Sequence, residues 1–483
     1  MQQIASIPKV STGIEGLDEI TSGGFPKGRP VLICGSAGCG KTLFGVQFLV
    51  KGILEYDEPG VFVSFEETSA DLTNNVGSLG FDLEKLTSEG KLRIDHIQIE
   101  RSEIEETGEY DLEGLFIRLN YAIDAIGAKR VVLDTIESLF SGMENEGLLR
   151  AEIRRLFRWL KEKGVTTVIT GERGDTTLTR QGLEEYVSDC VILLDFRVAN
   201  QIATRRLRIV KYRGSTHGTN EYPFLIDENG ISVIPITSLK LNYPTSTGII
   251  STGLRPLDAL FKKGGFYESS STLITGTAGT AKTILAGYFA LGSCLRNERV
   301  LLFSFEEAPD QTIRNLLTIG IDLRPYIDSK LLLIHASRPT LYGLEMHLLV
   351  VNKLLAEFRP RTVIVDPISS LVSVGGELEV KAMLVRLIDT LKMHKINALF
   401  TCLMSRIGSG ADDMTIDAVS SLADNWLYLQ NEQVGGKRER SLLIVKSRGM
   451  DHCNDLVNFT ISPAGISLAT SSTSKISNSA NGK

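Results

Sequence analysis

The sequence predicts an α/β protein of two tandem domains, each built on a mainly parallel central sheet. The chain has 483 residues, more than one hydrophobic core usually supports. Residues 10–24 recur in similar form from residue 250 onward, which indicates a duplicated domain. In both halves, short runs of Val, Ile and Leu alternate with segments of helical periodicity. This pattern is typical of a parallel sheet covered by helices on both faces.

Further blocks recur in the same order and support the duplication. After the first block and a glycine-rich loop, the matching segments are 61–68 with 301–308, 130–139 with 361–371, and 208–214 with 443–449. Between them, amphipathic helices are expected over 147–164 and 380–395.

The polar, turn-rich stretch 241–250 separates the two copies. We therefore expect a first domain at 1–245 and a second at 246–465. The remaining stretch, 466–483, is rich in serine and is predicted to be disordered.

Composition and charge disfavour several classes of protein. A net charge of −6 gives no support to a cationic nucleic-acid-binding surface. The N-terminal segment lacks the basic start and apolar core of a signal peptide, and no apolar run approaches the roughly 18 residues that span a bilayer. The six cysteines and six histidines show no metal-ligand spacing. We expect a cytoplasmic protein with reduced thiols, without membrane or nucleic-acid partners.

A phosphate-binding motif, GxxxxGK[ST], follows the apolar run 30–34 and precedes a predicted helix. Glycines allow backbone angles that point successive N–H groups at an anion at the helix N-terminus. Lys41 is expected to reach the β- and γ-phosphates of ATP, and the Thr42 hydroxyl to bind Mg²⁺. A chance glycine-rich turn is the alternative, which the flanking strand and helix disfavour. The motif comprises Gly35, Ser36, Ala37, Gly38, Cys39, Gly40, Lys41 and Thr42.

A second copy of the motif lies at the matching place in the second half. It comprises Gly276, Thr277, Ala278, Gly279, Thr280, Ala281, Lys282 and Thr283. Ala281 stands where the motif has glycine, and its methyl group is expected to oppose the backbone geometry and weaken nucleotide binding. Because Lys282 and Thr283 are intact, we still expect ATP and Mg²⁺ at both sites.

Paired acids follow the next apolar run in each half: Glu66 with Glu67, and Glu306 with Glu307. Adjacent side chains leaving a strand point to opposite sides, so one of each pair can face the γ-phosphate. Glu66 and Glu306 are the preferred general bases, with their neighbours as alternates. A solvated acidic turn is the other interpretation.

Two aspartates end later apolar runs and are candidate Walker B acids. Asp134 and Asp366 are placed to hold Mg²⁺ through water, although each could also be a structural turn residue. Glu306 is a further candidate for the Mg²⁺ site, with Thr42 and Thr283.

Taken together, the doubled phosphate loop, the doubled Phe-Glu-Glu and the two Lys-x-Arg-Gly segments resemble the KaiC family up to about residue 465. The resemblance implies two RecA-like P-loop NTPase domains and a homo-hexameric double ring that binds ATP between subunits. It also implies ATP hydrolysis in the first ring and Ser/Thr autophosphorylation and dephosphorylation in the second.

The resemblance also assigns residues position by position. In the first half, Ser78 is implied to contact nucleotide. Groups reaching the nucleotide of an adjacent first domain are implied to be Lys211, Arg213, Ser215 and His217; those of the second are Arg440, Lys446 and Arg448. Ser420 and Ser421 fall where the family carries its phosphorylated pair, whereas the first half has Glu184 and Glu185.

The resemblance does not extend to the serine-rich tail, the segment on which KaiA acts in clock proteins, so KaiA binding is not expected here. KaiB-like or other signalling proteins are the expected partners. Two other functions stay open at this point. One is a signalling scaffold that needs ATP binding but not turnover; the other is a RecA-type DNA motor, which the negative charge and the two tryptophans disfavour.

Overall fold

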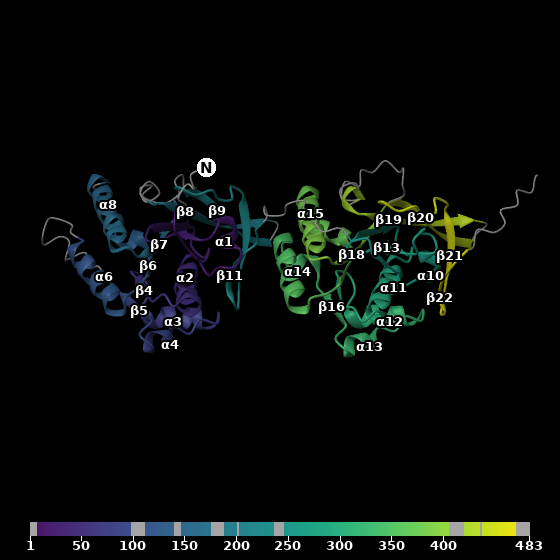
Figure 1. Ribbon diagram of the computed structural model, residues 1–483, viewed down its shortest axis with the longest axis horizontal. Coiled ribbons are helices and arrows are strands. Elements are labelled where there is room, and N and C mark those ends of the chain that lie inside the picture. The colour runs from purple at the N-terminus through teal and green to yellow at the C-terminus, as the bar shows by residue number, and fades with distance from the viewer. Residues whose placement is uncertain are drawn as a thin grey trace, which may run out of the picture. The chain divides into compact units, whose positions relative to one another are not determined.

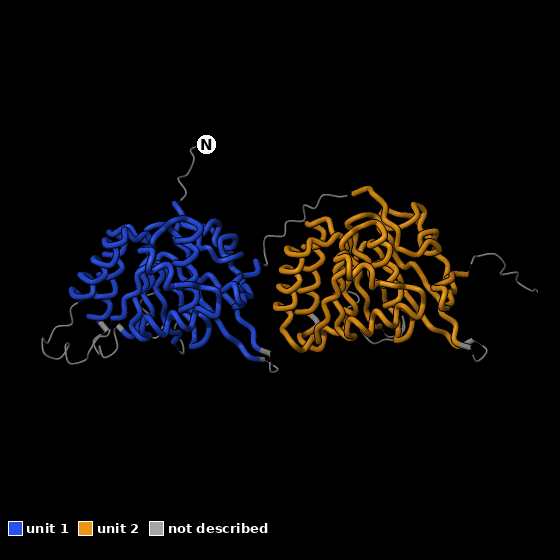
Figure 2. The backbone as a smooth tube through the Cα atoms, turned by 90° about the horizontal axis from the view of Figure 1, so that it is seen from below, with its two compact units in different colours: residues 1–238 blue, residues 239–483 orange. Residues whose placement is uncertain are grey.

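A computed structural model describes residues 7–97, 112–139, 146–174, 188–199, 202–235, 246–404, 420–434 and 437–469. The chain divides into two compact units, residues 1–238 and 239–483, which are described separately (Figure 2). The predicted boundary after residue 245 falls at the end of a stretch outside the described residues, so it stays a prediction.

The first unit contains, within the described residues, a nine-stranded sheet in the order β11-β10-β9-β8-β3-β7-β6-β4-β5. Its strands are β3 (Pro30–Gly35), β4 (Gly60–Ser64), β5 (Leu92–His96), β6 (Arg130–Asp134), β7 (Thr166–Glu172), β8 (Cys190–Ala199), β9 (Ile202–Tyr212), β10 (Glu221–Asp227) and β11 (Gly230–Val233). The strands from β8 to β5 run parallel, and β9, β10 and β11 add on as antiparallel hairpins. A separate ribbon pairs β1 (Lys9–Val10) with β2 (Phe25–Pro26).

Helices pack on both faces of this sheet (Figure 1). They are α1 (Leu17–Ile20), α2 (Lys41–Tyr56), α3 (Ser69–Gly77), α4 (Leu83–Ser88), α6 (Glu113–Ile126), α7 (Ile136–Leu139) and α8 (Glu146–Lys163). No helix of the described chain has both the length and the apolar character needed to cross a membrane.

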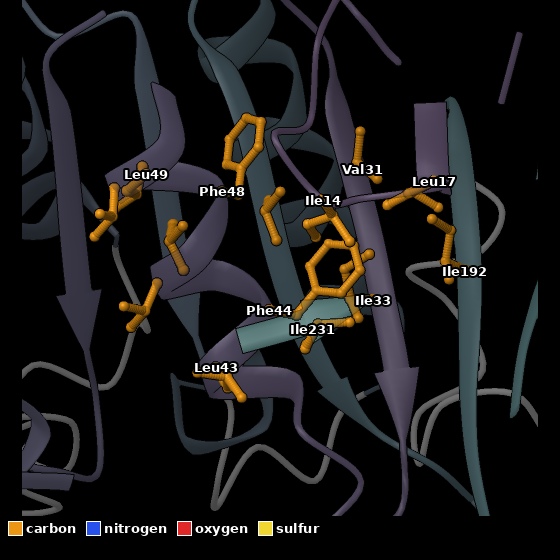
Figure 3. Close-up of a cluster of buried hydrophobic side chains, with 14 of the residues drawn as sticks. Ile14, Leu17, Val31, Ile33, Leu43, Phe44, Phe48, Leu49, Ile192 and Ile231 are labelled. Atoms are coloured by element: carbon orange, nitrogen blue, oxygen red, sulfur yellow. The ribbon is translucent and has the colours of Figure 1, made fainter. Parts of the chain in front are cut away.

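Strand β3 shows why its sequence is a continuous apolar run. Val31 and Ile33 pack in one core cluster with Phe44 and Phe48 of α2, as Figure 3 shows. The alternate residue Leu32 packs in a second cluster with α6 and α8. Because successive side chains of a strand point to opposite faces, a strand buried on both faces is apolar at every position. This confirms the predicted mainly parallel α/β sheet.

The second unit repeats the architecture with the order β16-β15-β17-β18-β14-β19-β20-β21-β22 in its described part. Its strands are β14 (Ser271–Gly276), β15 (Val300–Ser304), β16 (Leu332–Ala336), β17 (Thr362–Asp366), β18 (Asn397–Leu403), β19 (Asn425–Val434), β20 (Lys437–Ser447), β21 (Val457–Ser462) and β22 (Gly465–Leu468), with the ribbon β12 (Ile249–Ile250) and β13 (Phe266–Tyr267). Its helices are α10 (Arg255–Asp258), α11 (Lys282–Leu295), α12 (Pro309–Leu317), α13 (Arg324–Asp328), α14 (Leu344–Phe358), α15 (Glu377–Met393), η1 (Pro339–Leu341) and η2 (Ile368–Ser373).

The end of the second unit differs from the sequence prediction. Strand β22 runs through Leu468 and pairs with β21, and its Ile466 is buried in the core. Ordered structure therefore extends past residue 465, because an apolar side chain at 466 completes the core before the polar run begins. The rest of the predicted tail, 470–483, lies outside the described residues.

Candidate nucleotide sites and the cations opposite them

The first phosphate loop joins the carboxyl end of β3 to the start of α2. The Lys41 ammonium group donates to the carbonyl oxygens of Gly35 and Ser36, at 2.9 and 3.0 Å. Gly40 begins the helix with φ 101°, and no side chain caps the helix N-terminus. The first-turn N–H groups therefore remain to bind an anion, and the helix dipole favours a negative charge there. A phosphate group fits this position.

The second phosphate loop has the same conformation despite its alanine. Lys282 donates to the carbonyls of Gly276 and Thr277, at 2.8 and 2.9 Å, and α11 also lacks a side-chain cap. Ala281 adopts φ 81° and ψ 24°, the left-handed region that costs a non-glycine residue roughly 1 kcal/mol. The expected opposition of the methyl group is thus overcome by the surrounding fold. Whether nucleotide binds more weakly here stays a prediction.

Each Walker B aspartate contacts the threonine that follows the P-loop lysine. Asp134 accepts a hydrogen bond from the Thr42 hydroxyl at 2.8 Å and another from Thr170. Asp366 likewise accepts from Thr401 and from Thr283. Burial raises the pKa of both aspartates above the usual range, and the hydroxyl hydrogen bonds oppose that rise.

These hydroxyl–carboxylate pairs fit the predicted Mg²⁺ position. Within the described ranges, no three His, Cys, Asp or Glu side chains gather to hold a metal ion by themselves. A site made of one hydroxyl, water and phosphate oxygens, with a carboxylate behind, suits Mg²⁺ because this ion keeps several of its waters.

In the second unit the two glutamates face different sides. Glu306 accepts a hydrogen bond from Ser370 at 2.8 Å, and its charge acts on both Lys282 and Asp366. Glu307 instead faces α12, where Thr312 and Asn315 each donate to it at 3.3 Å. Glu306 therefore lies on the phosphate-loop side and Glu307 on the other.

In the first unit, Glu66 lies in the same relation to its Walker B strand. Its carboxylate accepts from Thr135 at 2.9 Å and from Ser138 at 2.5 Å. The backbone N–H of Glu67 donates to the Ser64 hydroxyl oxygen at 2.9 Å, and the Glu67 carboxylate charge acts on Asp134. Both carboxylates of this unit are thus near the aspartate, and Glu66 is the one bonded to hydroxyl groups.

The first Lys-x-Arg-Gly segment lies far from the phosphate loop of its own unit. Strand β9 ends at Tyr212, which is level with Cys190 and hence with Val31 at the start of β3. Gly35 is four residues further along β3, about 13 Å away at the usual strand rise. The residues from Lys211 onward are therefore at the opposite end of the sheet from their own P-loop.

The other predicted groups follow Tyr212 at that end. Arg213 lies 3.8 Å from the Asp189 carboxylate, and Ser215 accepts a hydrogen bond from Lys9 at 2.7 Å. The His217 ring stacks on Tyr212 at 6.5 Å. Ser78 lies elsewhere, at the end of α3, where its hydroxyl faces the Asn75 carbonyl at 3.5 Å.

The second segment brings Lys446 and Arg448 together with the two serines of the predicted phosphosite. Lys446 donates to the carbonyl of Ser420, and Arg448 to that of Ser421. Strand β20 ends at Ser447, level with Asn425 and hence with Thr272 near the start of β14. Lys446 and Arg448 therefore also lie at the end of the sheet opposite the P-loop of their own unit.

Arg440 does not belong to this group. It is level with Asn431, beyond the pairing of Gly276 with Leu429, and its guanidinium donates to the Gly279 carbonyl at 3.3 Å. The structure thus places Arg440 against the P-loop of its own unit, in contrast to the expectation that all three cations reach outward. The counterparts of the serines in the first half, Glu184 and Glu185, lie outside the described residues.

Two residues that sequence reasoning missed are Asp189 and Asp424. Each precedes the strand next to the P-loop strand, and each contacts an arginine of a Lys-x-Arg-Gly segment. Comparison of the two repeats could have found them, since Ser-Asp-Cys and Ala-Asp-Asn occupy the same place.

Comparisons with known proteins agree with this architecture. The family model for KaiC ATPases matches residues 10–238 and again 250–473. The chain is 57% identical over 466 residues to circadian clock protein KaiC2 of Synechocystis sp. (strain ATCC 27184 / PCC 6803 / Kazusa), covering 96% of this chain and 82% of that protein. It is 37% identical over 462 residues to circadian clock oscillator protein KaiC of Synechococcus elongatus, covering 95% and 89%. These matches span both units, each with its own P-loop and parallel sheet, and the chain therefore belongs to the KaiC family of tandem RecA-like ATPases.

Proposed function

We propose that the first unit hydrolyses ATP and that the second transfers the γ-phosphoryl group of ATP to Ser420 or Ser421 of a neighbouring copy. The observation that carries this is the position of the serines. They lie beside Lys446 and Arg448, at the opposite end of the sheet from the P-loop of their own unit. A P-loop from another copy is therefore needed as the phosphoryl donor.

The chemistry assigns roles to the residues described above. In the first unit, a water oxygen attacks the γ-phosphorus while Glu66 accepts its proton, and the bond from phosphorus to ADP breaks. In the second unit, a serine hydroxyl takes the place of water and Glu306 accepts the proton. Lys41 and Lys282 hold the phosphates, and cations from the adjacent copy face the developing negative charge.

Thr42 and Thr283 would hold Mg²⁺, which would supply positive charge to neutralise the phosphates. Asp134 and Asp366 orient the threonine hydroxyls that would face it. The family's hexameric double ring is the proposed assembly, because it supplies a neighbour for every unit. A KaiB-like or other signalling protein is the proposed partner in the cell.

The test is a mixing experiment between two inactive variants of the full chain. Lys282→Ala keeps the serines but loses the donor lysine, and Ser420→Ala/Ser421→Ala keeps the donor site but loses the acceptors. After incubation with Mg-ATP, phosphate is mapped by mass spectrometry on chains of distinguishable mass. We expect phosphoserine on the Lys282→Ala chain only in the mixture. Phosphate confined to wild-type chains, with none in the mixture, would contradict transfer between copies.

A matched pair tests the base. Glu306→Gln is expected to slow phosphorylation on the order of 10²-fold, as for loss of a general base. Glu307→Gln, whose carboxylate faces α12, should slow it much less. Equal losses would remove the distinction between the two glutamates. Absence of phosphoserine in the wild type, with ATP hydrolysis intact, would instead indicate a scaffold whose second unit only binds nucleotide.

A further inference from the structure

Asp424 lies at the centre of the contacts around the acceptor serines. Its carboxylate accepts from the backbone N–H and the hydroxyl of Ser271, both at 2.9 Å. Lys392 of α15 lies 2.9 Å from it, and Arg448 lies 3.9 Å away. The backbone N–H of Arg448 also donates to the Asp424 carbonyl at 2.9 Å. One residue thus connects β14, α15 and the arginine.

Asp189 has the same place in the first unit. Its side chain is 3% exposed, with Lys161 of α8 at 2.5 Å and Arg213 at 3.8 Å. The Arg213 N–H donates to the Asp189 carbonyl at 2.8 Å. The aspartate, lysine and arginine therefore form the same arrangement twice.

The two arrangements differ in what the start of the P-loop strand offers the aspartate, for a reason in the sequence. Ser271 donates its N–H to Asp424, but the corresponding residue of the first unit is Pro30, which has no N–H to donate. Arg29 lies 3.8 Å from the Asp189 carboxylate in this unit. A different donor faces the aspartate here, while the lysine and the arginine are the same in both units.

Each aspartate carboxylate also lies near the guanidinium group of an arginine whose side chain is about half exposed. The side chains of Arg213 and Arg448 are both 53% exposed, whereas the aspartates beneath them are largely buried. A buried carboxylate is costly unless cations surround it, and a long arginine side chain loses rotamer entropy when it is fixed. A carboxylate beside the guanidinium group restricts the arginine before a ligand binds, which reduces the entropy cost of binding.

We propose that Asp189 and Asp424 are positioning residues that orient Arg213 and Arg448 for contact with the phosphates bound by a neighbouring copy. Asp424 in addition ties the acceptor serines to the same arginine, because Arg448 donates to the Ser421 carbonyl. This inference rests on the proposed function, in which those cations act between copies. The two serines and Arg448 then approach the donor P-loop of the neighbouring copy together.

The alternative is that each aspartate only fastens a helix to the end of the sheet. Lys392 provides the control, since Lys392→Met breaks the helix contact and leaves Arg448 with its aspartate. Asp424→Asn keeps an acceptor for Ser271 but removes the charge that faces Arg448. If the aspartate only fastens the helix, the two variants should behave alike.

The experiment measures the rate of serine phosphorylation and the melting temperature of the full chain for Asp424→Asn, Lys392→Met and Arg448→Ala. We expect Asp424→Asn to slow phosphorylation on the order of 10–100-fold, the cost of a misplaced group, and Lys392→Met to slow it less than about threefold. In the Arg448→Ala background, Asp424→Asn should add almost nothing, because residues that act through each other are not additive. Equal losses in Asp424→Asn and Lys392→Met, or additive losses with Arg448→Ala, would overturn the proposal.

A second set of measurements uses the first unit and does not depend on serine phosphorylation. Asp189→Asn, Arg213→Ala and the double variant are compared by ATP hydrolysis, with Lys161→Met as the control. We expect the single and double losses to be similar in size and larger than that of Lys161→Met. If wild-type chains carry no phosphoserine, the proposed autokinase fails and these measurements alone decide the role of the aspartates. Additive losses here would overturn the inference even if the kinase is found.

Discussion

The two units reach the same phosphate-loop geometry with different residues at the start of the helix. Gly40 has φ 101° and Ala281 has φ 81°, and both lysines hold the two loop carbonyls within 0.1 Å of the same distances. Glycine at this position of the motif therefore reflects a requirement for positive φ. The surrounding fold can impose that conformation on alanine at a modest cost in free energy.

The neighbouring side chains explain why only one unit carries the alanine. A Cβ atom added at Gly40 would lie 2.9 Å from Cδ1 of Ile226. Ala281 instead packs at the edge of the second core, in the cluster that includes Ile461. Ile226 pairs with Ile231 and Ile461 with Ile466 in matching hairpins, so the two loops lie beside equivalent hairpins.

The largest effect expected from this comparison comes from the two P-loop lysines. Lys41→Ala should lower ATP hydrolysis on the order of 10²-fold or more, the usual cost of losing one contact to a developing charge. The rate of serine phosphorylation should be retained in this variant. Lys282→Ala should do the reverse, with serine phosphorylation lost and hydrolysis by the first unit retained. Each variant is the control for the other. Loss of both activities in either variant would mean that the two units do not work separately.

Exchange of the helix-start residues should have intermediate effects of unequal size. Gly40→Ala places a methyl group against Ile226 and is expected to destabilise the first unit by about 2 kcal/mol, with weaker nucleotide binding. Ala281→Gly removes left-handed strain of about 1 kcal/mol but also about 0.8 kcal/mol of methyl burial, so stability should change by less than about 1 kcal/mol. Thermal denaturation with and without ATP measures both. A large loss in Ala281→Gly would show that the methyl group is required.

Gly40 and Ala281 also show how far the sequence could predict the molecule. Repetition was enough to predict the two parallel sheets and the P-loops, because these depend on local pattern and on strand alternation. The roles of Asp134, Asp366 and Glu306 stay predictions. The separation of Arg440 from Lys446 depends on the register of β20 against β19. No local pattern fixes that register. The contact of Asp424 with Ser271 joins residues 153 positions apart, and only tertiary structure shows it.

The smallest effect concerns acid sensitivity of the second unit. The Nε2–H of His347 on α14 donates to the Pro339 carbonyl oxygen at 2.8 Å. It lines a cavity of about 10 Å³ together with His335 and Met383, room for about one water. Burial lowers the pKa of both histidines below their usual value.

The sign of the pH dependence follows from these lowered pKa values. Neutral histidine is favoured in the folded state, so its contribution to stability is present above the unfolded pKa of about 6.5 and is lost as pH falls through the lower folded pKa. The melting temperature should therefore decrease from pH 7.5 to 5 less steeply in His347→Gln, which can still donate to the Pro339 carbonyl. An unchanged slope would show that His347 contributes nothing to acid sensitivity.

Under the proposed transfer between copies, the opposed placement of donor and acceptor groups determines how copies of this chain associate. The P-loop and the Lys-x-Arg-Gly segment occupy opposite ends of one sheet, so an interface that joins them is head-to-tail and uses two different surfaces. An open row of such copies always leaves one donor without an acceptor and one acceptor without a donor. Only a closed ring completes every site. Turnover per chain should then rise steeply with protein concentration and level off once the rings have closed.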